Sequence, residues 1–167
     1  SAHFAFANGE FVKEVPHDPD YYFHGEEVSI AVRAFTHGYE LLHPHKIFLW
    51  HYYTRRGLKK HWDDHTKWGE RNDGSHKRNR KLLSMDGEVY DSDFFGIYGL
   101  GTERTLDEYE RYAGLSFSRR AVQQHTIDKK DAPCPLFETE EEYQNSYSIP
   151  FKHCIDIHFD SVPHDDY

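Results

Sequence analysis

The strongest constraint on the fold of this chain is an amphipathic segment that lies between Gly25 and Gly38. Its apolar residues recur at the i, i+3, i+4, i+7 spacing of one helical face. That face comprises Val28, Ala31, Val32 and Phe35, and it leaves out Arg33 and Thr36. Glu26 and Glu27 occupy the first turn, where the helix dipole favours negative charge, and glycine is preferred just past a helix end. The segment therefore predicts a helix over residues 26–37.

A second periodic segment, residues 46–53, alternates as a β-strand does. One face would carry Ile47, Leu49, His51 and Tyr53, and the other Phe48, Trp50 and Tyr52. His51 would then project from near the C-terminal end of the strand, which is a common position for catalytic or metal-binding groups in α/β domains. Arg55 and Arg56 follow directly and could bind a diphosphate through paired donors.

Further elements are predicted downstream. The run Thr105-Leu106-Asp107-Glu108 is a capping box, so it predicts a helix over residues 106–113. A helix is also predicted over residues 77–84, and the acidic run 138–142 reads as the start of another. Residues 155–159 alternate apolar and polar side chains and predict a short strand.

Net charge restricts the partners of this chain. The formal charge is −9 with histidine counted as neutral, which argues against a nucleic-acid partner. The segment from Arg55 to Lys81 is locally basic and contains Trp62 and Trp68. It is compatible with a nucleic-acid contact, with a loop and helix that close over an anionic ligand, or with a solvated basic face.

Apolar runs and cysteines indicate the compartment. No apolar run approaches the roughly 20 residues of a membrane-spanning helix, so no membrane span is predicted. The two cysteines, Cys134 and Cys154, form neither a disulfide scaffold nor a zinc motif. A reducing cytoplasm is the simpler interpretation, and we expect a cytoplasmic protein.

Two blocks of the sequence carry the motifs of a family. The first block contains Phe4-Ala5-Phe6-Ala7, Gly9-Glu10-Phe11, Glu14-Val15-Pro16, Gly25-Glu26-Glu27 and His51-Tyr52-Tyr53-Thr54-Arg55. The second contains Tyr98-Gly99-Leu100-Gly101-Thr102-Glu103-Arg104-Thr105-Leu106, with Tyr109 and Gly114. Together they span roughly residues 3–118 and resemble the GlcNAc-transferase family. Its best-known members add N-acetylglucosamine to hydroxyproline on a cytoplasmic ubiquitin-ligase subunit.

The resemblance implies an α/β chain that forms the C-terminal, acceptor-side half of a GT-A glycosyltransferase fold, with a mixed sheet and flanking helices. Residues 1–121 would form this acceptor-side and metal-binding half, and residues 122–167 would form an extension of unknown role. Such enzymes bind UDP through an upstream Rossmann-like half that ends in Asp-x-Asp. That half is absent from these residues, so we expect it as a partner and expect the segment alone to be inactive.

The resemblance also implies retaining transfer of N-acetylglucosamine from UDP-GlcNAc to a protein hydroxyl such as hydroxyproline, or to another protein or glycan acceptor, with Mn²⁺ or Mg²⁺. Carried over by position, Glu26 would hold the donor sugar and Glu27 would lie near the reacting carbon. His51 looks like the histidine that completes the metal shell. Cleavage of a sugar diphosphate leaves negative charge on the phosphates, which a divalent cation and nearby arginines can neutralise.

Two other patterns leave alternatives open. Asp91-Ser92-Asp93 could bind one hard cation, or it could be a solvated turn. His61 and His65 are four residues apart, which on a helix would let both imidazoles bind one transition metal. The chain has 14 histidines, so the alternative function is a His-rich metal-binding or non-haem-iron module without glycosyl transfer.

Overall fold

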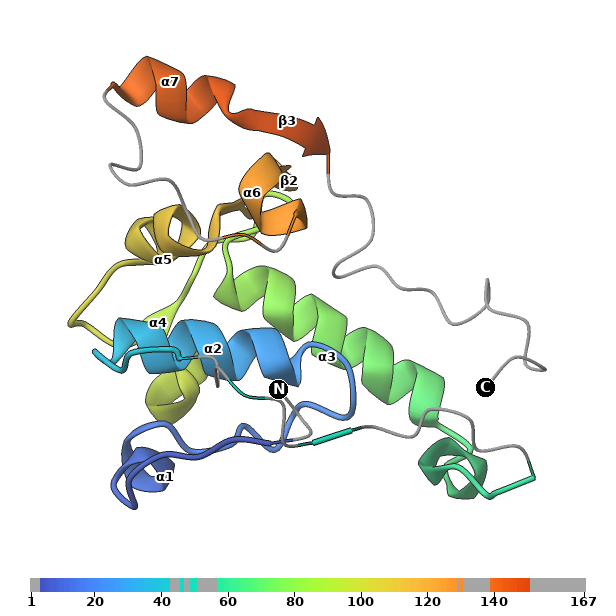
Figure 1. Cartoon of the computed structure of the whole chain (residues 1–167). Coiled ribbons are helices and arrows are strands. Elements are labelled where there is room, and N and C mark those ends of the chain that lie inside the picture. The colour runs from blue at the N-terminus through green and yellow to red at the C-terminus, as the bar shows by residue number, and fades with distance from the viewer. Residues whose placement is uncertain are drawn as a thin grey trace.

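The architecture is mainly helical, with one small sheet toward the C-terminal end (Figure 1). The computed structural model describes residues 4–42, 46, 49–50, 57–128, 130 and 139–150. The helices are α1 (Phe11–Glu14), α2 (Glu26–Thr36), α3 (Trp68–Leu82), α4 (Ser92–Phe95), α5 (Leu106–Ala113), α6 (Gln124–Ile127) and α7 (Glu140–Asn145), with two 3-10 turns, η1 (His61–Asp64) and η2 (Gly96–Tyr98). The strands are β1 (Leu115–Ser116), β2 (Ala121–Gln123) and β3 (Tyr147–Pro150). The fold class is therefore broadly α/β, as the sequence predicts.

The three strands pair side by side in the order β1-β2-β3, and both pairs are antiparallel. Val122 of β2 lies opposite Leu115 of β1 and Ile149 of β3. The sequence predicted a mixed sheet, whereas the described strands pair only in the antiparallel sense. The reason for β1 and β2 is the short turn of residues 117–120 that joins them, because parallel strands need a long crossover connection.

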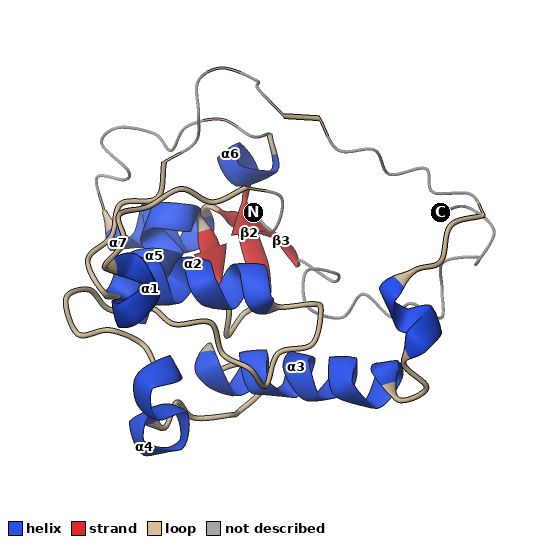
Figure 2. Cartoon of the chain, turned by 90° about the horizontal axis from the view of Figure 1, so that it is seen from below, coloured by secondary structure: helices blue, strands red, loops and turns tan. Residues whose placement is uncertain are grey.

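One apolar core joins helices from different parts of the chain. Helix α2 contacts both α3 and α5, and α5 also contacts β1. Figure 2 shows the strands in red beside α6, which contacts β2. Phe35 of α2 packs edge-on against Tyr109 of α5, with ring centroids 5.4 Å apart. The buried core consists of Val32, Phe35, Leu82, Leu83, Met85, Phe95, Tyr109 and Phe117.

Helix α2 confirms the helix predicted over residues 26–37, and Gly38 has the positive φ expected just past its end, +91°. Val32 and Phe35 are buried, as their spacing predicts. Arg33 and Thr36, which were predicted to lie off the buried face, are 1% and 0% exposed. The C-terminal half of the helix is therefore covered on most sides and not on one face alone.

Helix α5 begins and ends where the capping box predicted. The backbone N–H of Glu108 donates to Thr105 Oγ1 at 3.1 Å, and the backbone N–H of Thr105 donates to the Glu108 carboxylate at 2.6 Å. Helix α7 begins within the predicted acidic run. Helix α3 includes most of the predicted 77–84 helix but begins much earlier, at Trp68.

The strand predicted over residues 46–53 is not formed at its described positions, Lys46, Leu49 and Trp50. Leu49 and Trp50 are 50% and 82% exposed, so their alternation does not reflect burial of one sheet face. The remaining positions of that segment lie outside the described residues, as do both cysteines and residues 155–159. Among the helices that the structure describes, none has the length and apolar character needed to span a membrane.

Candidate functional site

The candidate site is the start of α2, where Glu26 and Glu27 form the first turn. Gly25 precedes them in the left-handed conformation, with a φ of +90°, and as a glycine it has no side chain that could cap the helix. Glu26 is partly buried and Glu27 is exposed. The two carboxylates therefore supply the negative charge that the positive end of the helix dipole favours.

Polar side chains of α3 hold the segment that leads into this helix. The backbone N–H of Tyr22 donates to Ser75 Oγ at 2.8 Å, and that of His24 donates to Asn72 Oδ1 at a longer 3.4 Å. Ser75 and Asn72 are both buried. Because backbone groups buried without a partner are costly, these bonds specify the path of the segment.

Asn79 of α3 makes two further bonds to the same segment. Its side-chain Nδ2 donates to the Gly25 carbonyl at 2.9 Å, and its Oδ1 accepts from the Tyr21 hydroxyl at 2.8 Å. Asn79 is fully buried and Tyr21 is 8% exposed. Burial disfavours the phenolate and raises the pKa of Tyr21 to about 12, so the hydroxyl keeps its proton and remains a donor.

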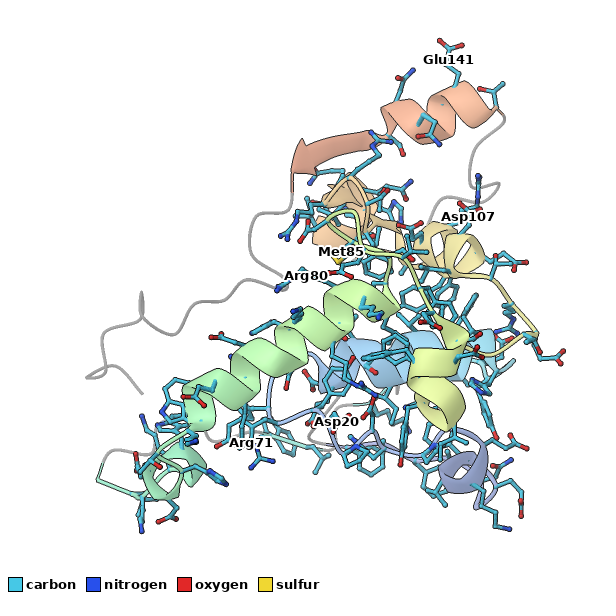
Figure 3. The ribbon with its side chains drawn as sticks, turned by 180° about the vertical axis from the view of Figure 1, so that it is seen from behind. Asp20, Arg71, Arg80, Met85, Asp107 and Glu141 are labelled. Carbon is cyan, nitrogen blue, oxygen red and sulfur yellow. The ribbon has the colours of Figure 1, made fainter. Side chains whose placement is uncertain are left out.

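An ion pair joins α3 to the beginning of the segment. Arg78 Nε lies 2.7 Å from Asp18 Oδ2, and the two side chains are 11% and 2% exposed. Asp20 adds a longer contact with Arg78, at 3.4 Å. Figure 3 shows the segment with Asp20 running alongside α3, with side chains between them. Several turns of α3 thus contact the chain just before the site.

Aromatic and imidazole rings pack against the segment that leads into α2. Phe23 lies 6.0 Å from Trp62, and Trp62 lies 6.3 Å from Trp68, measured between ring centroids. His24 stacks on His76 of α3 at 6.0 Å, with the ring planes 17° apart. The proposed carboxylates therefore lie next to a segment that packs against α3 and η1.

The second motif of the sequence, residues 98–106, lies at the opposite end of α2. The carbonyl of Thr36 accepts hydrogen bonds from the backbone N–H groups of Glu103 and Arg104, at 3.0 and 3.2 Å. The Thr36 hydroxyl accepts a further bond from the backbone N–H of Gly101 at 2.9 Å. Because α2 has 11 residues, this end is about 15 Å from its first turn. The second motif therefore binds the C-terminal end of α2 and does not lie beside Glu26.

Arg33 fastens the same motif to α2. Its guanidinium donates to the carbonyls of Pro16, Ile97 and Gly99, at 2.7, 3.2 and 3.3 Å. Burial lowers the pKa of Arg33, and the nearby Asp18 carboxylate opposes that shift. One charged side chain thus ties the loop after α1, the helix of the site and the second motif together.

The structure places Glu26 and Glu27 together at one helix start, as predicted. His51, Arg55 and Arg56 lie outside the described residues, so their proximity to Glu26 stays a prediction. Within the part of the chain that is described, no group of three His, Cys, Asp or Glu side chains could hold a metal ion.

The two other metal patterns have local structural settings. Asp91 accepts a hydrogen bond from the backbone N–H of Asp93 at 3.0 Å and caps α4. The α-helix assumed for the His61 and His65 pair is wrong, because η1 is a 3-10 turn and His65 follows it with extended backbone. His65 Nε2 lies 3.1 Å from Arg71 Nη1.

Sequence reasoning missed the polar residues that support the site. Asn72, Ser75, His76 and Asn79 recur at i, i+3, i+4 and i+7, and all are buried. This is the spacing of one helical face, the same signal that revealed α2. It went undetected because a search for apolar periodicity passes over a buried face made of amides, a hydroxyl and an imidazole.

Known proteins provide one point of comparison. A family model described as Glycosyltransferase (GlcNAc) matches residues 1–119, well over half of the 167 residues. The matched range includes the start of α2 and the second motif. No curated protein and no solved structure matches the chain.

Proposed function

Because the chain belongs to the family described as Glycosyltransferase (GlcNAc), we propose that it is the acceptor-side half of a GT-A enzyme that uses UDP-GlcNAc. Glycosyl transfer, with a nucleotide-sugar donor and an acceptor, follows from the family. The proposal adds retaining transfer of N-acetylglucosamine to a protein hydroxyl such as hydroxyproline, or to another protein or glycan acceptor. It also places the protein in the cytoplasm.

The observation that carries the proposal is the supported carboxylate pair at the start of α2. Glu26 is partly buried and follows a backbone segment held by α3, so its carboxylate can orient sugar hydroxyls, which are hydrogen-bond donors. Glu27 is exposed and can lie beside the reacting carbon and the acceptor. A fixed carboxylate costs little reorganisation when charge develops on the sugar ring.

We further propose that His51 is one ligand of Mn²⁺ or Mg²⁺ and that Arg55 and Arg56 contact the diphosphate. A single imidazole among oxygen ligands suits such a cation. When bound, the cation neutralises the diphosphate leaving group. The remaining ligands would come from the Asp-x-Asp of the upstream UDP-binding half.

The proposed domain division assigns residues 1–121 to the catalytic half and residues 122–167 to an extension. The division falls inside β2, which pairs with β1 on one side and β3 on the other. The extension would therefore begin as part of the sheet of the catalytic half.

The test is hydrolysis and transfer of UDP-GlcNAc by the complete protein that carries this chain, with Mn²⁺. Replacing Glu26 with Gln should lower turnover by roughly 100-fold, because the carboxylate charge is lost. Glu70→Gln is the matched control, since Glu70 is an acidic first-turn residue of another helix, α3. It should change turnover by less than about twofold.

His51→Ala should lower the apparent affinity for Mn²⁺ as well as turnover. Wild-type turnover in both Glu26→Gln and His51→Ala would refute the residue assignments. Use of a different sugar nucleotide, with no use of UDP-GlcNAc, would refute the donor.

A further inference from the structure

The contact between Asn79 and Gly25 determines how the residue before Glu26 is held. The Gly25 carbonyl can only accept a hydrogen bond, so the Asn79 side chain must present its Nδ2 donor to it, at 2.9 Å. This fixes the amide orientation, and Asn79 Oδ1 then accepts from the Tyr21 hydroxyl at 2.8 Å. Both polar atoms of the buried Asn79 amide are thus engaged with the segment that leads into the site.

The same contact is sterically tight. A Cβ atom on Gly25 would collide with Asn79 Nδ2, and the φ of Gly25, +90°, disfavours any side chain there. The Gly25 carbonyl also accepts from the backbone N–H of Ser29 at 2.9 Å, which is the first hydrogen bond of α2. Asn79 therefore bonds the carbonyl from which the helix starts.

We propose that Asn79 is the positioning residue of the site, which acts through Glu26 by fixing the start of α2. This inference rests on the proposed role of Glu26. Asn72 and Ser75 bond the backbone at His24 and Tyr22, farther upstream. Asn79 is the α3 residue whose bond reaches the position directly before Glu26. Loss of its donor lets the first turn of α2 shift, and Glu26 shifts with it.

A matched pair of substitutions tests, without an activity measurement, whether Asn79 fixes the start of α2. Asn79→Asp replaces the donor with an oxygen that faces the Gly25 carbonyl, whereas Asn72 accepts its bond, so Asn72→Asp keeps that bond. Hydrogen exchange of the complete protein should show the backbone amides of residues 29–31, the first that are bonded within α2, losing about tenfold protection in Asn79→Asp. Asn72→Asp should leave their protection close to that of the wild type. Equal protection in the two variants would overturn the proposal.

If Asn79→Asp lacks the circular dichroism spectrum of a folded protein, the hydrogen-exchange measurement is made on Asn79→Ser instead. Serine has no buried charge, and its shorter side chain cannot bond both Gly25 and Tyr21. Tyr21→Phe is the complementary variant, because it removes the hydroxyl and leaves the Asn79 donor to Gly25 in place. Protection of residues 29–31 should fall in Asn79→Ser and not in Tyr21→Phe, and the reverse result would overturn the proposal.

A double-mutant cycle tests whether Asn79 acts through Glu26. Asn79→Asp should lower kcat for UDP-GlcNAc hydrolysis by roughly 10- to 100-fold when Glu26 is present. In the Glu26→Gln background the same substitution should change kcat by less than about twofold. Additive losses would assign Asn79 a general structural role and overturn the positioning role.

The two experiments separate the inference from the function on which it rests. A wild-type protein that does not use UDP-GlcNAc would overturn the proposed function and, with it, the catalytic part of this inference. The exchange measurement would still show whether Asn79 fixes the start of α2, because it needs no substrate.

Discussion

At the scale of single residues, buried polar side chains determine how the segments of this protein meet. Arg33 is the largest buried example, with a guanidinium that bonds three carbonyls from two separate loops. Its planar fork of donors suits several acceptors at once, which a lysine ammonium cannot match from one position. Tyr21 and Asn79 form a second buried polar contact, next to Gly25 at the start of α2.

Arg33→Lys should lower the free energy of unfolding by about 3 kcal/mol, since at least one buried carbonyl would lose its charged donor. Urea unfolding measures the change. Arg111→Lys is the control, because the ion pair of Arg111 with Asp107 lies on the surface of α5, where such a pair contributes less than about 1 kcal/mol. Equal losses in the two variants would show that the carbonyl contacts of Arg33 contribute little.

The raised pKa of Tyr21, about 12, predicts a loss of stability at alkaline pH. In the unfolded chain the phenol ionises near pH 10, so the folded state holds the proton more tightly between pH 10 and 12. The free energy of unfolding should therefore fall as the pH rises through this window, and fall less in Tyr21→Phe. A difference titration of phenolate absorbance between the two proteins should centre near pH 12. A centre near 10 would contradict the burial effect.

At the scale of elements, the sequence predicted those helices whose signals are apolar spacing or caps. Helix α2 followed from its apolar face, and α5 from Thr105 and Glu108. Only the C-terminal part of α3 was predicted, because its buried face is polar. The segment 46–53 alternates, but alternation predicts a strand only where a neighbouring strand and a core face exist. At the described positions Leu49 and Trp50 the side chains are exposed instead.

The capping box of α5 gives a prediction at this scale. Thr105→Ala should lower the free energy of unfolding by about 1 kcal/mol, whereas Thr105→Ser, which keeps the hydroxyl, should lower it by a few tenths. The bond from the Thr105 backbone lowers the pKa of Glu108, so the contribution of the cap is present above the ordinary pKa of glutamate and lost as the pH falls below it. Denaturant unfolding at neutral and acidic pH measures both effects.

At the scale of the whole molecule, the family match ends near the β1–β2 turn, but the packing continues. All three residues of β2 are buried, and Gln123 of β2 bonds Ser146, which precedes β3. Phe117 stacks on Tyr109 of α5, with ring planes 5° apart. Strand pairing and the bond from Gln123 to Ser146 therefore continue the fold beyond the end of the matched range.

The candidate site could be predicted only in part from the sequence. Glu26 and Glu27 stand on a helix that apolar spacing reveals, so their position at a helix start was predicted correctly, and their role in the site stays a prediction. Their support by Asn79 depends on a contact 54 positions away in the chain, between polar side chains and backbone. Local patterns carry no signal for such a contact. His51 remains a prediction, since it lies outside the residues that the structure describes.

Val122→Ala tests whether β2 and α2 unfold together. Val122 is 2% exposed, so the substitution should lower the free energy of unfolding by about 2 kcal/mol. Leu115, the strand partner of Val122, packs against the core that contains Val32 and Phe35 of α2, so hydrogen exchange in α2 should accelerate along with exchange in β2. Val89→Ala, at a site that is 75% exposed, is the control and should have little effect. Acceleration confined to β2 would show that the sheet unfolds separately from the helices.

The close contact between Thr36 and the loop that contains Gly101 has a consequence for the evolution and the engineering of this chain. A Cβ atom on Gly101 would collide with the backbone of Thr36 and His37, so the two segments fit only as a matched pair. A hybrid that received residues 25–38 from a relative, without the relative's own 98–106 loop, would inherit a mismatch at this joint. Grafts should transfer both segments as one cassette, and lineages that diverge in one should show compensating changes in the other.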